Sequence, residues 1–435
     1  MNRPPHRRAP RRRAAAVLQR TLELDIVSLG GRGDGIAFHA GEPVFVPCTA
    51  PGDRIVARIE GKRGDGLAGT LVEVLISGQG RVSPPCPHFT MCGGCAVQHL
   101  ERSAYAAWKR GLLTDALRRA GVDPGPVAEL VQIAPGTRRR AALAFAHRRS
   151  AVSVGFNARA SHQVVDVARC LLLAPPLAAL LPPLRTLLSE VTADGDEGAA
   201  VVTSTSGGVD LVIEAVGRLD LFSRERLASF AENQDVARLS WRTAAGVEPL
   251  AQRRPAIVQF AGVPVLLPPA AFLQPSRQGE LALAALVADA VGNRTPVADL
   301  YAGCGSFTFL LAQKAQVHAI DGDAAAVQAL KAAAGQAGVR VTGECRDLAY
   351  RPLLGDELKR FQAVVFDPPR AGAAPQAASL ARDGPPLVVA VSCNPATLAR
   401  DARILCDGGY RLVRSTPVDQ FPWSAHLETV ALFER

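Results

Sequence analysis

The sequence predicts a multidomain protein with a small N-terminal β-barrel, a central α+β domain and a C-terminal α/β domain. Short alternating strands with glycine-rich turns fill residues 21–80. A group of closely spaced cysteines follows, and from residue 269 to 435 strands alternate with helices. A chain of 435 residues, 48% of them hydrophobic, is long enough for two or three such domains. We place the central domain at residues 81–268.

The net charge of +9 is unevenly distributed along the chain. Residues 1–20 contain seven arginines and no acidic residue, and we expect a disordered basic tail there. A second basic patch, between residues 137 and 170, sets seven arginines against the single acid Asp166: Arg138, Arg139, Arg140, Arg148, Arg149, Arg159 and Arg169. Such clustering is typical of proteins that bind the phosphate backbone of nucleic acid. Ordinary solvated charge is the alternative interpretation.

The chain contains no run of about 18 uninterrupted apolar residues, which is the length that a membrane-spanning helix needs. Its first residues also lack the apolar core of a secretion signal. We therefore expect a cytoplasmic protein that makes no membrane contact. In that compartment the nine cysteines indicate metal ligands or catalytic thiols, not disulfides.

Residues 21–80 predict a barrel of the OB type. Residues 22–27, 43–47 and 53–59 alternate apolar and polar side chains as strands do, and residues 30–35 form a glycine-rich loop. Barrels of this type bind oligonucleotides on their strand faces.

A metal site is predicted by Cys86, Cys92 and Cys95, which are separated by five and two residues. Two glycines between the last two cysteines let the backbone wrap a centre and offer N–H groups to the sulfur atoms. Cys170 is the best candidate for the fourth ligand, because the other cysteines fall in segments assigned to strands, turns or helices. Zinc and a four-iron cluster both suit four thiolates. Beyond this site, residues 101–120 predict a helix that we expect to pack on the C-terminal domain.

The C-terminal domain predicts a Rossmann-like nucleoside site. A strand over residues 297–301 leads into a glycine-rich turn at residues 302–307, and the next strand, 317–321, ends on Asp321. The turn lets a ligand approach the backbone, and the carboxylate can accept ribose hydroxyls. A dinucleotide-binding dehydrogenase is the competing interpretation, but Thr308 occupies the place of the third glycine of its fingerprint. S-adenosylmethionine fits a site without a pyrophosphate better.

Two later strands, over residues 361–366 and 386–391, end on Asp367 and Cys393. Because ligands bind at the carboxyl ends of strands in such sheets, these two residues predict a reactive site. Cys393 also precedes a helix with Asn394 as its N-cap and Pro395 as its first residue. The positive helix end should favour a nucleophilic thiolate, although a buried structural cysteine is the alternative.

Three segments make the chain similar to a known family. Residues 367–372 (DPPRAG), 392–401 (SCNPATLARD) and 419–428 (DQFPWSAHLE) resemble those of the RNA 5-methyluridine methyltransferases. With the four cysteines and a barrel that resembles a TRAM domain, the chain is most similar to the branch that methylates 23S ribosomal RNA.

The resemblance implies a class I methyltransferase that depends on S-adenosylmethionine and transfers a methyl group to uridine C5. In this family a cysteine attacks C6 of the base and a glutamate removes the C5 proton. These roles fall on Cys393 and Glu428. The implied cofactor contacts are Gln274, Tyr301, Ser306, Asp321, Asp347 and Asp367. A 4Fe-4S cluster on Cys86, Cys92, Cys95 and Cys170 is implied as well.

The implied partner is RNA, with 23S rRNA favoured over tRNA, and we expect a monomer. Two other classes fit parts of the sequence. A cytosine or exocyclic-amine methyltransferase would share the segment that begins at Asp367, but it would not need the separate Cys393 and Glu428. A non-catalytic RNA-binding protein would explain the basic patch and the barrel only.

Overall fold

The computed structural model describes residues 20–215 and 219–435, so the basic tail lies outside the described residues except for Arg20. The chain forms two compact units. The first ends at Ser83 and also includes His99–Glu101, and the second comprises Pro84–Gln98 and Arg102–Arg435. The central and C-terminal segments, which we expected as separate domains, therefore belong to one unit. No helix in the described part of the chain is long and apolar enough to cross a membrane.

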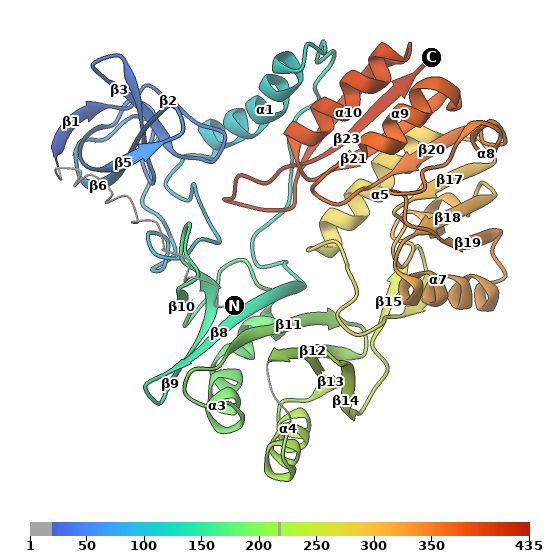
Figure 1. The fold of residues 1–435 in the computed structure, drawn as a ribbon, viewed down its shortest axis with the longest axis horizontal. Helices are drawn as coiled ribbons and strands as arrows, with labels where there is room; N and C mark the ends of the chain where they lie inside the picture. The colour runs from blue at the N-terminus through green and yellow to red at the C-terminus, as the bar shows by residue number, and fades with distance from the viewer. Residues whose placement is uncertain (1–19, 216–218) are drawn as a thin grey trace, which may run out of the picture. The chain divides into compact units, whose positions relative to one another are not determined.

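The first unit is a six-stranded sheet (Figure 1). Its strands are β1 (Thr21–Asp25), β2 (Ser28–Leu29), β3 (Gly35–His39), β4 (Glu42–Val46), β5 (Arg54–Arg63) and β6 (Gly66–Ile76). They lie in the order β1-β5-β6-β4-β3-β2. Alternate residues such as Leu22, Leu24 and Ile55 are buried in one apolar core, as the period of two in the sequence requires. The glycine-rich segment after β2 is a turn, as predicted.

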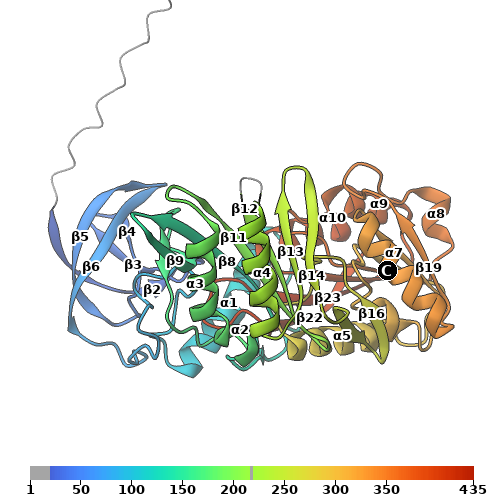
Figure 2. The ribbon, with the colours of Figure 1, turned by 90° about the horizontal axis from the view of Figure 1, so that it is seen from below.

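The central part of the second unit is a seven-stranded sheet with the order β10-β9-β8-β11-β12-β13-β14. The strands are β8 (Arg140–Arg148), β9 (Ala151–Asn157), β10 (Val164–Asp166), β11 (Glu197–Thr205), β12 (Gly208–Ala215), β13 (Val236–Thr243) and β14 (Gly246–Gln252). The helices are α2 (Pro175–Ala179), α3 (Leu181–Val191) and α4 (Leu221–Asn233). Figure 2 shows α3 and α4 side by side across this sheet. A hairpin of β15 (Ile257–Phe260) and β16 (Val263–Leu266) follows.

The C-terminal part is an eight-stranded sheet with the order β19-β18-β17-β20-β21-β23-β22-β7. The strands are β7 (Val131–Gln132), β17 (Val297–Leu300), β18 (Val317–Asp321), β19 (Val341–Cys345), β20 (Ala363–Phe366), β21 (Leu387–Ser392), β22 (Arg411–Asp419) and β23 (Glu428–Glu434). The five strands from β19 to β21 are parallel, whereas β23 runs antiparallel to β21. The predicted mixed α/β architecture is confirmed.

Helices cover both faces of this sheet (Figure 1). They are α5 (Arg277–Val291), α6 (Thr308–Leu311), α7 (Ala324–Ala337), α8 (Gly355–Lys359), α9 (Ala374–Asp383) and α10 (Pro395–Asp407). Val364 and Phe366 pack with α9 and α10, whereas Val365 packs with α5. A strand that is buried on both faces consists of a continuous run of apolar residues, which is the pattern seen in the sequence.

Helix α1 (Arg102–Arg119) packs on α10 and β22 of the same unit. Lys109 interrupts its apolar stripe but is fully buried, and its Nζ lies 2.8 Å from Oδ1 of Asp419. The Tyr105 hydroxyl donates a hydrogen bond to the other carboxylate oxygen of Asp419 and accepts one from the backbone N–H of Trp423 at 3.0 Å. Because a buried charge is tolerated when it is paired and hydrogen-bonded, this network fixes the loop between β22 and β23.

Candidate active site

Strand pairing brings Cys393 and Glu428 together. β21 and β23 pair antiparallel with Leu387 opposite Glu434 and Ser392 opposite Thr429. Continuing this register by one residue places Cys393, which follows β21, opposite Glu428, which begins β23. Glu428 is only 2% exposed, and Cys393 is half-buried at the start of α10.

The helix after Cys393 begins as predicted, but the pKa of the thiol does not shift as predicted. The Asn394 side chain caps α10 by accepting the N–H of Ala396 at 3.1 Å. Burial nevertheless raises the pKa of Cys393 to about 11, and the charges of Glu428 and Asp367 add to this shift, while Arg370 opposes it. The expected lowering of this pKa is therefore wrong for the ligand-free site, because burial and two carboxylates outweigh the helix end.

The pKa values of the two carboxyl groups in the site are both raised. Asp367 follows β20, which pairs in parallel with β21. Burial raises the pKa of Glu428 to about 7, and a hydrogen bond from Gln420 opposes this shift. The pKa of Asp367 is raised by burial and then by the charges of Glu428 and Asp299. A carboxyl group whose pKa lies near neutrality is suited to act as a general base.

Two buried amides connect these carboxyl groups. Gln274 donates from Nε2 to Oδ2 of Asp367 at 2.9 Å. Gln420 donates from Nε2 to Oε1 of Gln274 at 2.6 Å and to Oε2 of Glu428 at 2.7 Å. Sequence reasoning missed the role of Gln420. The only available signal was its position in the segment before Glu428, where a buried amide at the end of β22 must find polar partners.

The other sequence-predicted cofactor residues lie along the carboxyl ends of the parallel strands. Tyr301 follows β17 with a φ of 61°, and burial raises the pKa of its phenol to about 12, with smaller contributions from the charges of Asp401, Asp347 and Asp321. Asp321 accepts the N–H of Gly303 at 2.8 Å and retains free lone pairs for ribose hydroxyls. Ser306 is half-buried in the glycine-rich turn, and Asp347 is exposed after β19.

The four predicted metal ligands lie near one another. Burial and, to a smaller extent, the charges of Cys170, Cys92 and Cys86 together raise the pKa of Cys95 to about 12. The N–H of Gly94 lies 3.4 Å from Sγ of Cys92, as the glycine argument predicted. The neighbouring glycine donates instead to the backbone of Asn157.

Within residues 20–215 and 219–435, no three His, Cys, Asp or Glu side chains are grouped so that they could hold one metal ion. A mononuclear zinc site requires such a group, with sulfur atoms about 2.3 Å from one point. A four-iron cluster instead separates its four thiolates around a larger body. Cys95 is buried, Cys86, Cys92 and Cys170 are half-buried, and four thiols with a backbone N–H beside one of them are a donor set that suits such a cluster.

Several arginines of the basic patch contact other residues of the protein. Arg139 is buried and paired with Glu280, and Arg148 is paired with Glu197. Arg138 lies over the ring of Phe421. Arginines that are paired in this way contribute to folding more than to nucleic-acid binding.

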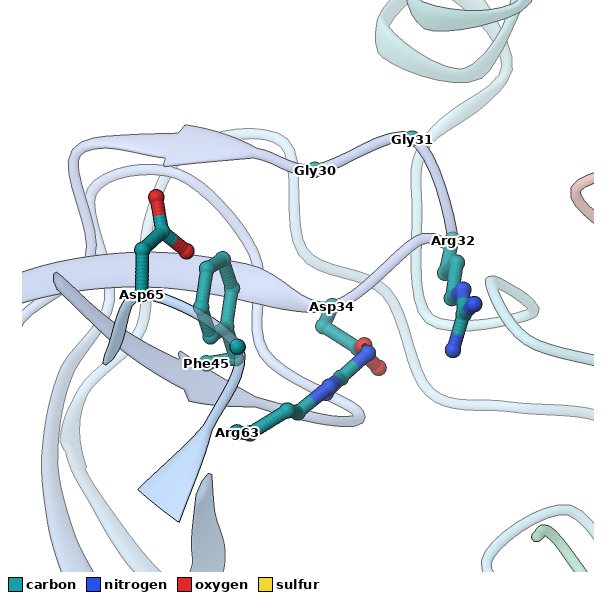
Figure 3. Close-up of a pocket in the computed structure, with 8 residues that line it drawn as sticks. Gly30, Gly31, Arg32, Asp34, Phe45, Arg63 and Asp65 are labelled. Atoms are coloured by element: carbon teal, nitrogen blue, oxygen red, sulfur yellow. Dashed lines mark hydrogen bonds and ion pairs between the residues drawn. The ribbon is translucent and has the colours of Figure 1, made fainter. Parts of the chain in front are cut away.

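The first unit contains a cavity of about 420 Å³ at its glycine-rich loop (Figure 3). Arg63 lies over the ring of Phe45 at 5.2 Å and pairs with the buried Asp34 at 2.7 Å. Arg32 extends from the loop at the rim of the cavity, as Figure 3 shows. An arginine stacked on an aromatic ring is a common platform for nucleobases.

Similarities to known proteins place this chain among the RNA methyltransferases. A family model described as tRNA (uracil-5-)-methyltransferase matches residues 267–435. An uncharacterized RNA methyltransferase of Mesorhizobium japonicum is 44% identical over 94% of this chain and 97% of the relative. The 23S rRNA (uracil(1939)-C(5))-methyltransferase RlmD of Aeromonas salmonicida is 32% identical over 95% and 96% of the two chains.

Among solved structures, the Pyrococcus abyssi tRNA (uracil-54, C5)-methyltransferase, in complex with S-adenosyl-L-homocysteine, matches with a TM-score of 0.73. It shares 23% identity, with 95% of this chain and 100% of that chain covered, and therefore shows the fold. The chain belongs to the S-adenosylmethionine-dependent RNA (uracil-5-)-methyltransferase family.

Proposed function

We propose that this enzyme methylates C5 of a uridine in RNA, with Cys393 as the nucleophile and Glu428 as the general base. The observation that carries the proposal is the placement of the half-buried Cys393 opposite the buried Glu428, whose pKa is raised to about 7. Uracil C5 is too weak a nucleophile to accept a methyl group unaided, and a thiol with an adjacent base overcomes this limit.

In the proposed reaction, the Cys393 thiol loses its proton to solvent, the thiolate sulfur bonds to C6, and the C5–C6 π electrons move to the carbonyl as an enolate. S-adenosylmethionine supplies an electrophilic methyl group, which C5 takes as the C–S bond of the sulfonium breaks. Glu428 then removes the C5 proton, the C5–C6 double bond re-forms, and the bond to Cys393 breaks. Asp367 and Gln274, which are hydrogen-bonded to each other, would orient the groups that bind beside them.

The cofactor would occupy the carboxyl ends of β17 to β20. We assign Asp321 to the ribose hydroxyls and Tyr301 to a face of the adenine, with Ser306 and Asp347 at the edge of the same pocket. Gln274 and Asp367 would border the methionine part, next to Cys393. A cationic group bound there would offset the negative charges that keep the thiol protonated, so thiolate formation would accompany ligand binding.

We infer that the substrate is 23S rRNA, because the chain is 32% identical to a 23S rRNA enzyme over nearly its full length. tRNA is the second candidate, favoured by the description of the matching family model. The barrel, which we assign as a TRAM domain, would contact RNA through the cavity at Phe45 and Arg63. Since the base is inaccessible in a stacked helix, the uridine must be flipped or single-stranded. We propose a cytoplasmic monomer.

Transcripts containing 5-fluorouridine should trap the enzyme covalently. Fluorine cannot leave C5 as a proton does, so the adduct with Cys393 persists after methyl transfer. We expect a shifted band on a denaturing gel with 23S rRNA fragments, with S-adenosylmethionine present, and none with tRNA. A shift with tRNA alone would reassign the substrate, and no shift with either RNA would contradict the proposed mechanism.

We further propose that Cys86, Cys92, Cys95 and Cys170 hold a 4Fe-4S cluster. Protein purified without oxygen should contain about four iron atoms per chain. Cys170→Ser should lower the iron content and the visible absorbance, whereas Cys406→Ser, on α10, should leave both unchanged. Stoichiometric zinc in place of iron would refute this assignment.

A further inference from the structure

A continuous chain of buried side-chain hydrogen bonds runs from Asp367 through Gln274 and Gln420 to Glu428. Gln274 and Gln420 are each 3% exposed, and Glu428 is 2% exposed. Solvent therefore does not compete with these bonds, which are strong in such surroundings. The general base assigned above is held by a neighbouring amide at the end of β22.

The side-chain amide of Gln420 is oriented with its nitrogen, not its oxygen, toward its two partners. Its Nε2 donates to both Gln274 and Glu428, while its buried Oε1 has no hydrogen-bond partner among the described residues. Turning the amide over would place Oε1 against the acceptor oxygens of Glu428 and Gln274. An unpaired buried acceptor is costly, so its presence indicates that the two donated bonds are needed more.

Helix α5 leaves space for this orientation. A Cβ added to Gly279, in the first turn of α5, would lie 2.6 Å from Oε1 and 2.8 Å from Cβ of Gln420. Both distances are shorter than any van der Waals contact, and the amide is held from several sides. Glycine at position 279 is therefore required for the present position of Gln420.

We propose that Gln420 is a positioning residue for Glu428, which holds its carboxylate opposite Cys393 and favours its ionised form, and that Gly279 provides the space for it. This inference rests on the proposed role of Glu428 as general base. A bond donated to a carboxylate stabilises the charged form that accepts the C5 proton.

The other titratable groups around Glu428 are accounted for. Asp367 and Cys393 face it from the ends of β20 and β21, and Arg370 is the cation that lowers the pKa of Cys393. On β22, Asp419 is paired with Lys109, and on α5, Glu280 is paired with Arg139. Gln420 is thus the group whose hydrogen bond lowers the pKa of Glu428.

The test uses Gln420→Leu, which removes the donors at similar volume, and Gly279→Ala, which displaces the amide while leaving Gln420 in the chain. Full-length enzyme, RNA and cofactor with a labelled methyl group are mixed in single turnover and quenched between pH 6 and pH 9.5. Methylated RNA that is still bound to protein is separated from free methylated RNA on a denaturing gel. Cofactor affinity is measured in parallel by calorimetry.

We expect the methylated adduct at pH 7 to persist about fivefold longer in both variants, because a rise of about one unit in the pKa of the base lowers its ionised fraction from about one half to about one tenth. Raising the pH should restore its lifetime to within about twofold of wild type. If the adduct persists longer by the same factor at every pH, Gln420 only supports the fold. An unchanged adduct lifetime would also overturn the proposal. If Glu428→Gln instead releases methylated RNA normally, the proposed role of Glu428 fails, independently of Gln420.

Discussion

Replacing Cys393 with alanine should abolish methyl transfer to RNA while leaving the affinity for S-adenosylmethionine close to that of the wild type. The sulfur atom forms the bond that makes C5 nucleophilic, and no other thiol is placed opposite Glu428 in the described structure. Removal of a covalent nucleophile typically costs at least about a thousandfold in rate. Single-turnover transfer of a labelled methyl group measures the rate, and calorimetry measures cofactor binding.

Cys406→Ala is the matched control, because Cys406 is a half-buried thiol on α10, the helix that Cys393 precedes. It should methylate RNA at the wild-type rate and form the 5-fluorouridine adduct. Appreciable turnover by Cys393→Ala would exclude the covalent mechanism, whatever the control shows.

The strands and helices of the active-site region could be predicted from the sequence because they depend on local patterns. Apolar runs gave β20 and β21, and their carboxyl ends carry Asp367 and Cys393 where the parallel sheet requires. Asn394 and Pro395 marked the start of α10 correctly, because capping involves only neighbouring residues.

The polar contacts across the site could not be predicted in this way. Gln274 and Gln420 lie in contact only because α5 and β22 pack together. No periodicity in the sequence predicts that these two side chains are close. Lys109 and Asp419 are equally remote in the sequence. The sign of the pKa shift at Cys393 was missed for the same reason, because it depends first on the burial of the thiol and then on the charges of Glu428 and Asp367, which lie at the ends of other strands.

Glu428→Gln should stop the reaction after methyl transfer, so that a protein–RNA adduct carrying the methyl group accumulates with ordinary RNA. The amide cannot accept the C5 proton, and the bond to Cys393 then cannot break. Denaturing gels with labelled cofactor measure the adduct. Glu434→Gln, at the half-buried far end of the same strand, should leave turnover intact. Release of methylated RNA by Glu428→Gln would identify another base.

The same substitution should stabilise the folded protein in a pH-dependent manner. Burial raises the pKa of Glu428 from 4.5 to about 7 on folding, so its ionised form disfavours the folded state. The penalty is absent below pH 4.5, where both states are protonated, and complete above pH 7, where it is on the order of 3 kcal/mol. In urea unfolding, Glu428→Gln should therefore be more stable than wild type at pH 8 and equally stable at pH 4.5. Equal stability at both pH values would mean that Glu428 is not held in an environment that disfavours its charge.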